Sequence, residues 1–234
     1  MTEHSLVPPE TRARIKTLAV PVALAVGRAG LTPNALTVIG FGGVCVSAAL
    51  AATGNWVAAG VIGLLFAAFD MLDGALARAT ARVSRFGAFL DSTLDRAGEG
   101  VLYAGIVGGT ASVTDRGLPM LAALAMVAAF LVSYTRARAE GLGFGGDVGV
   151  APRAERVVIM AVGLIATGLA GGVATPVGLF RPGEWVDLPG GARILTTGGQ
   201  PWLAATLAIL FILSTITVLQ RIWHVRAQAR RAKE

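Results

Sequence analysis

Cysteine and aromatic residues are scarce in this chain of 234 residues. It contains one cysteine, Cys45, and two tyrosines, and aromatic residues make up 6% of it. A single cysteine excludes a disulfide or a thiolate metal site within one chain. The shortage of aromatic side chains for base stacking argues against nucleic acid as a partner, although the net charge is +6. Anionic lipid headgroups and phosphorylated substrates suit this charge better.

Charged residues are also few, at 15% of the chain, whereas hydrophobic residues make up 54%. Soluble domains typically contain about 45 to 50% apolar residues, so this composition, with a mean hydropathy of +0.68, excludes an ordinary soluble domain. Apolar runs long enough to span a bilayer occur at 35–53, 55–77, 86–110, 117–137, 154–175 and 202–222. We expect residues 1–234 to form a single domain, an all-α integral membrane protein whose six transmembrane helices form a bundle at 35–222.

The segments on either side of this bundle are short and basic. Residues 10–29 imitate a signal peptide, but Pro21 interrupts the apolar part and Arg28 follows it. We expect an amphipathic helix that lies in the membrane interface, and at the other end a basic cytoplasmic tail at 223–234. Proline and glycine are frequent at 176–200, where WVDLPGGARILTT is typical of a small hairpin.

The basic residues are distributed unevenly between the two sides of the expected membrane. With the N-terminus inside, all but three of the 20 lysines and arginines fall on cytoplasmic segments, the exceptions being Arg116, Arg181 and Arg193. The positive-inside rule therefore places both termini in the cytoplasm. The expected location is the cell (plasma) membrane, as a multi-pass protein with its active site on the cytoplasmic side.

Four aspartates stand out in this apolar sequence. Asp70 and Asp73 are three residues apart, and Asp91 and Asp95 are four apart, so each pair shares one face of a helix. Carboxylates at membrane depth are costly and usually mark a functional site. Ligation by oxygen alone suits Mg²⁺, Mn²⁺ or Ca²⁺ rather than zinc. The stretch therefore predicts a divalent metal site, while its chemistry alone leaves open which aspartate acts as a base.

The spacing D-x2-D-G-x2-A-R-x8-G-x3-D-x3-D, from Asp70 to Asp95, resembles the signature of the CDP-alcohol phosphotransferases. The resemblance implies that Asp70, Asp73, Asp91 and Asp95 hold two Mg²⁺ ions, with Mn²⁺ as an alternative, and that Asp95 is also the general base. It implies CDP-diacylglycerol as donor, an alcohol that attacks the lipid-side phosphorus, and CMP as leaving group. The donor-binding residues that it implies are Asn34, Ala35, Leu36, Thr37, Gly74, Ala77, Arg78, Ser84 and Gly87.

Three later segments resemble a narrower group, the actinobacterial phosphatidylinositol phosphate synthases. They are SYTRARAEGLG, APRAERVVIM and LQRIWHV. The likeness implies inositol 1-phosphate as acceptor, and guanidinium forks suit its phosphate dianion. We expect Arg156 to support this site while paired with Glu155 or Glu140. The acceptor-binding residues that we predict are Ser133, Arg136, Arg153 and Arg221, with Arg136 standing where the group has lysine.

Several other functions remain open on the sequence alone. Phosphatidylglycerol phosphate synthase and archaetidylinositol phosphate synthase would use the same aspartates with another acceptor or another lipid, although the Gly-Lys-x-Lys-Thr-like segment of the first is absent. A small cation-coupled transporter would bind its ion at an acidic cluster, but it predicts broken helices or a repeat, and neither is visible. A purely structural membrane protein leaves the aspartates unexplained. The family resemblance also suggests a homodimer.

Overall fold

Long helices and a two-stranded hairpin make up the described part of the chain. The computed structural model describes residues 20–111, 116–173, 184–187, 193–196 and 198–231, and for Asp70 and the two strands it describes only the backbone. The helices are α2 (Pro33–Ala52), α3 (Trp56–Ala79), α4 (Arg85–Thr110), α5 (Gly117–Gly141), α6 (Arg153–Leu169) and α7 (Gln200–Arg231). Each coincides with an expected apolar run to within a few residues, except at the ends of α6 and α7, so the helical fold is confirmed.

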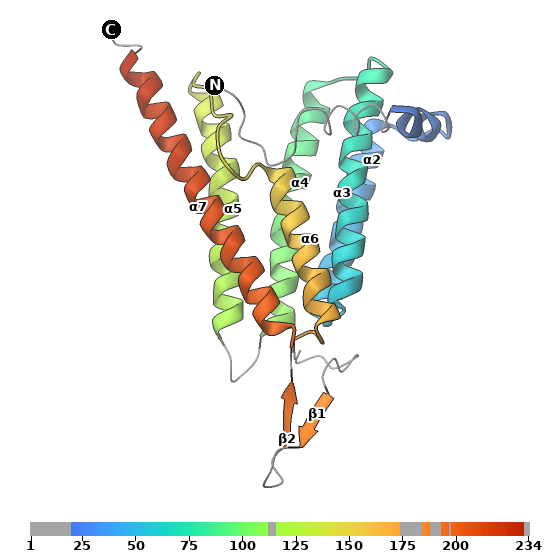
Figure 1. The fold of residues 1–234 in the computed structure, drawn as a ribbon. Coiled ribbons are helices and arrows are strands. Elements are labelled where there is room, and N and C mark those ends of the chain that lie inside the picture. The colour runs from blue at the N-terminus through green and yellow to red at the C-terminus, as the bar shows by residue number, and fades with distance from the viewer. Residues whose placement is uncertain (1–19, 112–115, 174–183, 188–192, 197, 232–234) are drawn as a thin grey trace.

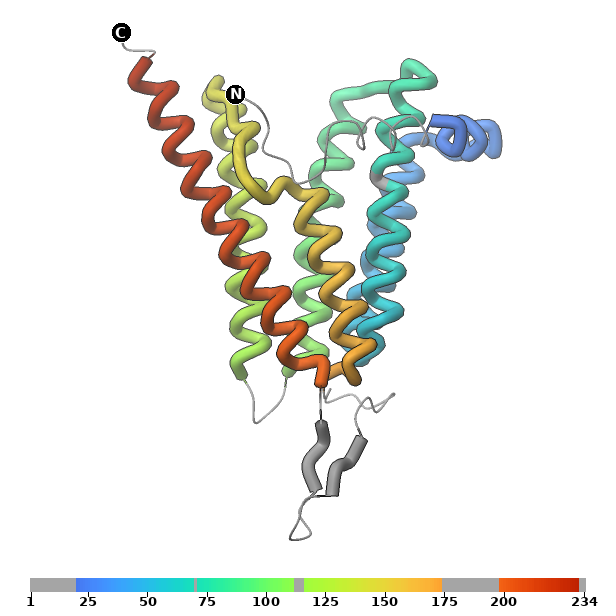
Figure 2. Tube along the Cα trace, in the orientation of Figure 1, coloured from blue at the N-terminus to red at the C-terminus, as the bar shows by residue number. Residues whose placement is uncertain are grey.

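These helices run alternately in opposite directions (Figure 1), and their contacts close them into a ring. α2 packs against α3 and α4, α4 against α5, α5 against α7, α7 against α6, and α6 against α3. One end of the ring therefore brings together the ends of α3, α5 and α7 with the starts of α4 and α6. A helical segment at 20–28 lies across this same end instead of along the bundle (Figure 2).

The helices differ in how well they suit a membrane. Four of them, α2, α3, α5 and α7, are long and apolar enough to cross one by length and composition. The first half of α4 carries several charged residues, and α6 has 17 residues with a charged first turn, RAER. The chain is therefore a helical membrane protein in which α4 and the start of α6 are less apolar than the four candidate spans.

The boundaries differ most from prediction at the last two helices. α6 ends at Leu169 rather than near 175, because the Gly172 N–H donates to the Thr167 carbonyl at 2.8 Å and closes the helix. α7 continues to Arg231, through most of the expected tail. The predicted hairpin is confirmed, since β1 (Glu184–Asp187) pairs antiparallel with β2 (Arg193–Thr196). The first half of the predicted interfacial helix at 10–29 lies outside the described residues.

Small residues allow α2 and α4 to approach closely. Ala48 and Ala51 of α2 are buried, and their carbonyl oxygens occupy the space in which side chains at Gly105 and Gly109 of α4 would lie. Close backbone approach through small residues is a common way for membrane helices to associate. This contact fixes α4, and with it the second pair of aspartates, against α2.

We expect Gly105→Ala to lower the melting temperature of the detergent-solubilised protein, because its Cβ would overlap the Ala48 carbonyl group. The free energy of unfolding should fall by about 1–3 kcal/mol, as is typical of overpacking. Gly108→Ala is the matched control, since its Cβ would meet the Ala52 Cβ at an ordinary 3.8 Å, and it should keep or raise the melting temperature. Equal melting temperatures for the two variants would contradict the close approach.

Candidate active site

The two pairs of aspartates lie on either side of a short connection. Asp70 and Asp73 belong to the last part of α3, and Asp91 and Asp95 to the first half of α4. Between these helices Ala81 adopts a left-handed conformation, with φ 54°, as residues that follow a helix end often do. Since α2 packs against both α3 and α4, the two pairs lie at the same end of the ring, next to α2.

Asp73 is buried, with 5% of its surface exposed, and is bonded to a neighbouring helix. The Thr37 hydroxyl of α2 donates to Asp73 Oδ2 at 2.6 Å, as a buried carboxylate requires. The side chain of Asp70 lies outside the described residues. Among the side chains that are described, no three acidic, histidine or cysteine groups gather as a metal site. The site of four aspartates therefore stays a prediction.

The predicted donor residues at the starts of α2 and α4 lie close together. Ser84 caps α4 by accepting a hydrogen bond from the Gly87 N–H at 2.9 Å. A Cβ on Gly87 would lie 3.0 Å from Ser84 Oγ and 3.2 Å from Asn34 Oδ1. Two polar side chains from different helices thus border a stretch of bare backbone, where a flat group could lie against the chain.

The other predicted donor residues have different surroundings. Arg78 is exposed and folds back over Gly74, with Nη1 lying 3.2 Å from the place of a Cβ on that glycine. Leu36 is completely buried in the apolar cluster that joins the 20–28 segment to α2 and α3, so in this structure it packs the helices. Two further predicted donor residues, Ala35 and Ala77, are partly exposed.

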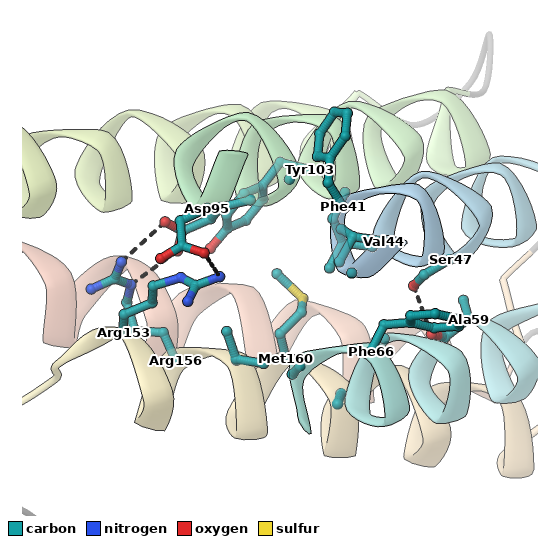
Figure 3. Close-up of a pocket in the computed structure, with 18 of the residues that line it drawn as sticks. Phe41, Val44, Ser47, Ala59, Phe66, Asp95, Tyr103, Arg153, Arg156 and Met160 are labelled. Atoms are coloured by element: carbon teal, nitrogen blue, oxygen red, sulfur yellow. Dashed lines mark hydrogen bonds and ion pairs between the residues drawn. The ribbon is translucent and has the colours of Figure 1, made fainter. Parts of the chain in front are cut away.

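Two ion pairs, one helical turn apart, join α4 to α6 (Figure 3). In the upper pair, Arg153 Nη2 lies 2.8 Å from Asp95 Oδ1. In the lower pair, Arg156 donates two bonds of 3.0 Å to Glu99, from Nε to Oε1 and from Nη2 to Oε2. Arg156 also donates from Nη1 to the Ala151 carbonyl at 3.1 Å. A predicted acceptor-binding cation and the predicted base are therefore in direct contact.

Glu99 is a site residue that local sequence does not reveal as the partner of Arg156. Proximity in the sequence favours Glu155 or Glu140, yet the two-bond partner of Arg156 is Glu99 on another helix. A signal exists nevertheless, because Glu99 follows Asp95 by four residues and so extends the same face of α4. The acidic face of this helix is one turn longer than the family signature.

The predicted acceptor residues of α5 lie at its exposed end. Arg136 contacts Glu140 at 2.9 Å and Asp147 at 3.1 Å, and nearly half of its side chain is exposed. Ser133, three residues earlier, is partly exposed. These contacts hold the Arg136 guanidinium between two carboxylates at the surface, which an incoming anion would have to displace.

Arg221 is buried and ties α7 to its neighbours. Its Nε donates to the Val148 carbonyl at 2.8 Å, and its Nη1 donates to the Val132 carbonyl of α5. Three more side chains of α7 bond to the backbone of the loop before α6: Thr217 at Ala151, Gln220 at Val150 and Gln228 at Gly145. One face of α7 therefore holds this loop, and the role of Arg221 in acceptor binding stays a prediction.

A cleft opens between α2, α3, α4 and α6 beside the ion pairs. It holds about 850 Å³ of empty space, counting the part open at its mouth. Asp95 and Arg153 lie at one end, and most of the other lining residues, such as Phe66 and Met160, are apolar (Figure 3). Thr37, the donor to Asp73, also lines the cleft. A cleft with one charged end and apolar walls suits an amphiphilic ligand.

Comparison with known proteins agrees with these features. The family model for CDP-alcohol phosphatidyltransferase matches residues 30–181. The phosphatidylinositol phosphate synthase of Mycolicibacterium smegmatis is 36% identical over 219 residues, which cover 92% of this chain and 87% of that protein. The archaetidylinositol phosphate synthase of Pyrococcus horikoshii is 38% identical over 150 residues, covering 64% of this chain and 77% of that protein.

Solved structures of the phosphatidylinositol phosphate synthase of Mycobacterium tuberculosis share the fold. The crystal structure with CDP-DAG bound gives a TM-score of 0.71 at 31% identity and covers 89% of this chain and 94% of that one. The structure with manganese and citrate gives a TM-score of 0.71 at 32% identity and covers 88% of each chain. The family model matches more than half of the chain, and the relatives are similar over most of it. The chain therefore belongs to the CDP-alcohol phosphatidyltransferase family.

Proposed function

We propose that this chain is an enzyme of phospholipid biosynthesis that transfers the phosphatidyl group of CDP-diacylglycerol to inositol 1-phosphate, giving phosphatidylinositol phosphate and CMP. The observation that carries the proposal is the contact of Asp95 with Arg153 at 2.8 Å. It puts a carboxylate suited to the acceptor hydroxyl beside a guanidinium suited to the acceptor phosphate. The phosphatidylinositol phosphate synthase of M. smegmatis, 36% identical over most of the chain, supports the choice of acceptor.

The donor is proposed to lie at the ends of α2, α3 and α4. Its cytidine would lie against the bare backbone near Gly74 and Gly87, within reach of Asn34 and Arg78, while its lipid tails stay in the bilayer. The polar side chains around Gly87 and the exposed Arg78 guanidinium support this placement. The M. tuberculosis relative, whose structure holds CDP-DAG, supports the same class of donor.

A divalent cation is part of the proposal. The residues proposed to hold it offer only carboxylate oxygens, the chemistry that Mg²⁺ and Mn²⁺ prefer, so the donor set fits: Asp70, Asp73, Asp91 and Asp95. We propose two ions, with Mg²⁺ as the first choice. When bound, such ions neutralise the charge of a diphosphate and of its leaving group. The relative's structure with manganese and citrate supports divalent metal use.

The proposed reaction assigns separate tasks to the protein's own residues. Asp95 takes the proton from the acceptor hydroxyl, whose oxygen then bonds to the lipid-side phosphorus. The bond from that phosphorus to the bridging oxygen breaks, and CMP leaves with the electron pair. Arg153 binds the acceptor phosphate and so brings the hydroxyl to Asp95. The remaining proposed acceptor ligands are Ser133, Arg136 and Arg221.

The arrangement in the membrane is a further part of the proposal. We propose that α4 and α6 cross together with the four apolar helices, because the ring places them among these neighbours. The 17 residues of α6 reach about 26 Å, close to the hydrocarbon thickness. The segment at 20–28 would lie in the cytoplasmic interface of the cell membrane, with both termini on the same side. A homodimer is proposed from the family resemblance.

One other function has an observation in its favour. The archaetidylinositol phosphate synthase of P. horikoshii is 38% identical over 150 residues. As its name implies, such an enzyme differs in the lipid, so the aspartates and the acceptor site described above would serve it equally well. Comparing CDP-diacylglycerol with CDP-archaeol as donor separates the two functions.

The experiment that tests the proposed function measures CMP release by the purified protein in detergent. CDP-diacylglycerol and Mg²⁺ are supplied with inositol 1-phosphate, free inositol or glycerol 3-phosphate in parallel. Of the three acceptors, we expect only inositol 1-phosphate to support turnover. A chelator that removes the metal should abolish turnover, and added Mg²⁺ should restore it. Turnover only with another alcohol would refute the acceptor assignment. No turnover with any of the three acceptors would refute the proposal that the chain is this enzyme.

We expect Asp95→Asn to lower kcat by about 10²–10⁴-fold, the usual effect of removing a general base, while leaving substantial CDP-diacylglycerol binding. Asp73→Asn is the contrasting variant, because Asp73 is proposed only as a metal ligand and its loss should weaken donor binding in Mg²⁺ as well as turnover. Donor binding is measured by titration calorimetry alongside turnover. If Asp95→Asn lost donor binding as fully as Asp73→Asn, Asp95 would have to be reassigned as chiefly a metal ligand.

A further inference from the structure

The two ion pairs between α4 and α6 differ in burial and in hydrogen bonding. The Arg156 side chain is 2% exposed and Glu99 is 13% exposed, and the pair has two mutual bonds plus the bond to Ala151. The Asp95 and Arg153 side chains are 15% and 34% exposed. A buried arginine joined to its carboxylate by two hydrogen bonds resists separation, whereas an arginine that is one-third exposed can exchange its partner with less loss. The lower pair is therefore an anchor, and the upper pair can open.

The backbone of Arg153 is kept in place while its side chain can move. Arg156 holds the Ala151 carbonyl just before α6, and the Ala151 N–H donates to Thr217 Oγ1 of α7 at 3.2 Å. Val150 is held likewise by Gln220 at 3.2 Å. A change of side-chain rotamer at Arg153 can therefore open the upper pair while the backbone at the start of α6 stays held.

Each partner of the upper pair has another task in the proposed reaction. The Arg153 guanidinium lies 2.8 Å from Asp95 Oδ1 and so takes up one of the acceptor positions that the O–H of a nucleophile can use. A phosphate dianion offers the guanidinium several charged oxygens in place of one carboxylate oxygen. An acceptor that carries a phosphate can therefore draw Arg153 away from Asp95, whereas water cannot.

Building on the proposed function, we infer that Arg153 selects the phosphorylated acceptor over water by holding Asp95 until the acceptor phosphate binds. The reaction that it suppresses is hydrolysis of the donor. In that reaction a water oxygen bonds to the lipid-side phosphorus, the bond to the bridging oxygen of CMP breaks, and Asp95 takes the proton. The products are phosphatidic acid and CMP, so hydrolysis and transfer differ in their lipid product.

The first test is Arg153→Gln in the purified full chain, with CDP-diacylglycerol, Mg²⁺ and no acceptor. We expect phosphatidic acid to form about tenfold faster than in the wild type, the order of effect of one charge-assisted hydrogen bond. The requirement for inositol 1-phosphate should rise more than that for the donor. Arg138→Gln removes the same charge from an exposed position at the end of α5 and should change neither rate. No rise in phosphatidic acid with Arg153→Gln would overturn the inference.

The second test needs no variant and decides the matter if Arg153→Gln fails to fold. Inorganic phosphate supplies the dianion of the acceptor without its hydroxyl, so it should speed wild-type donor hydrolysis severalfold at constant free Mg²⁺. A folded Arg153→Gln protein should not respond. If the wild type transfers to inositol 1-phosphate but phosphate leaves donor hydrolysis unchanged or slows it, the inference is overturned. A wild type without such transfer would refute the proposed function instead.

Discussion

Charge enclosed in an apolar ring of helices is the constraint on which this structure depends. The lower ion pair shows how the constraint is met, since Arg156 and Glu99 satisfy each other with two bonds and Ala151 takes a third. Removing either partner would leave an uncompensated charge, which typically costs about 3–5 kcal/mol. α4 and α6 therefore cannot slide past each other, and the relative height of Asp95 and Arg153 follows from this register.

A second constraint comes from the far end of the chain. The loop before α6 contains glycines and has no regular structure of its own, so its backbone groups must find partners elsewhere. α7 supplies them from one face, through Thr217, Gln220, Arg221 and Gln228. The charged start of α6 is therefore positioned from two sides, by α4 through the ion pairs and by α7 through the loop.

Much of this arrangement could be predicted from the sequence, because local patterns determine it. Apolar runs and their breakers located the helices to within a few residues, apart from the ends of α6 and α7, and Pro-Gly-Gly between two short β-prone runs indicated the hairpin. The spacing of the aspartates placed each pair on one helix face. The partner of Arg156 could not be predicted in this way, because Glu99 lies 57 residues away and the pairing depends on which helices adjoin in the ring.

Arg221 is a residue whose role could not be predicted from its local sequence. An arginine at the end of a membrane helix fits a cytoplasmic flank, an anion ligand or an internal tie equally well, because the local pattern is the same. Only packing reveals that its guanidinium donates to carbonyls of two other segments. The end of α6 at Leu169 is similar, since the residues up to 175 remain apolar and a hydrogen bond from Gly172 decides where the helix stops.

The last turns of α7, which lie beyond the apolar run, contact the loop before α6. The Gln228 carboxamide both accepts from the Gly145 N–H and donates to the Gly145 carbonyl, at 3.0 and 2.9 Å. The last turns of α7 thus hold the loop that leads to Arg153. Because these bonds lie close to the C-terminus, a purification handle or fusion partner attached there belongs behind a flexible spacer, and the chain should not be cut before Gln228.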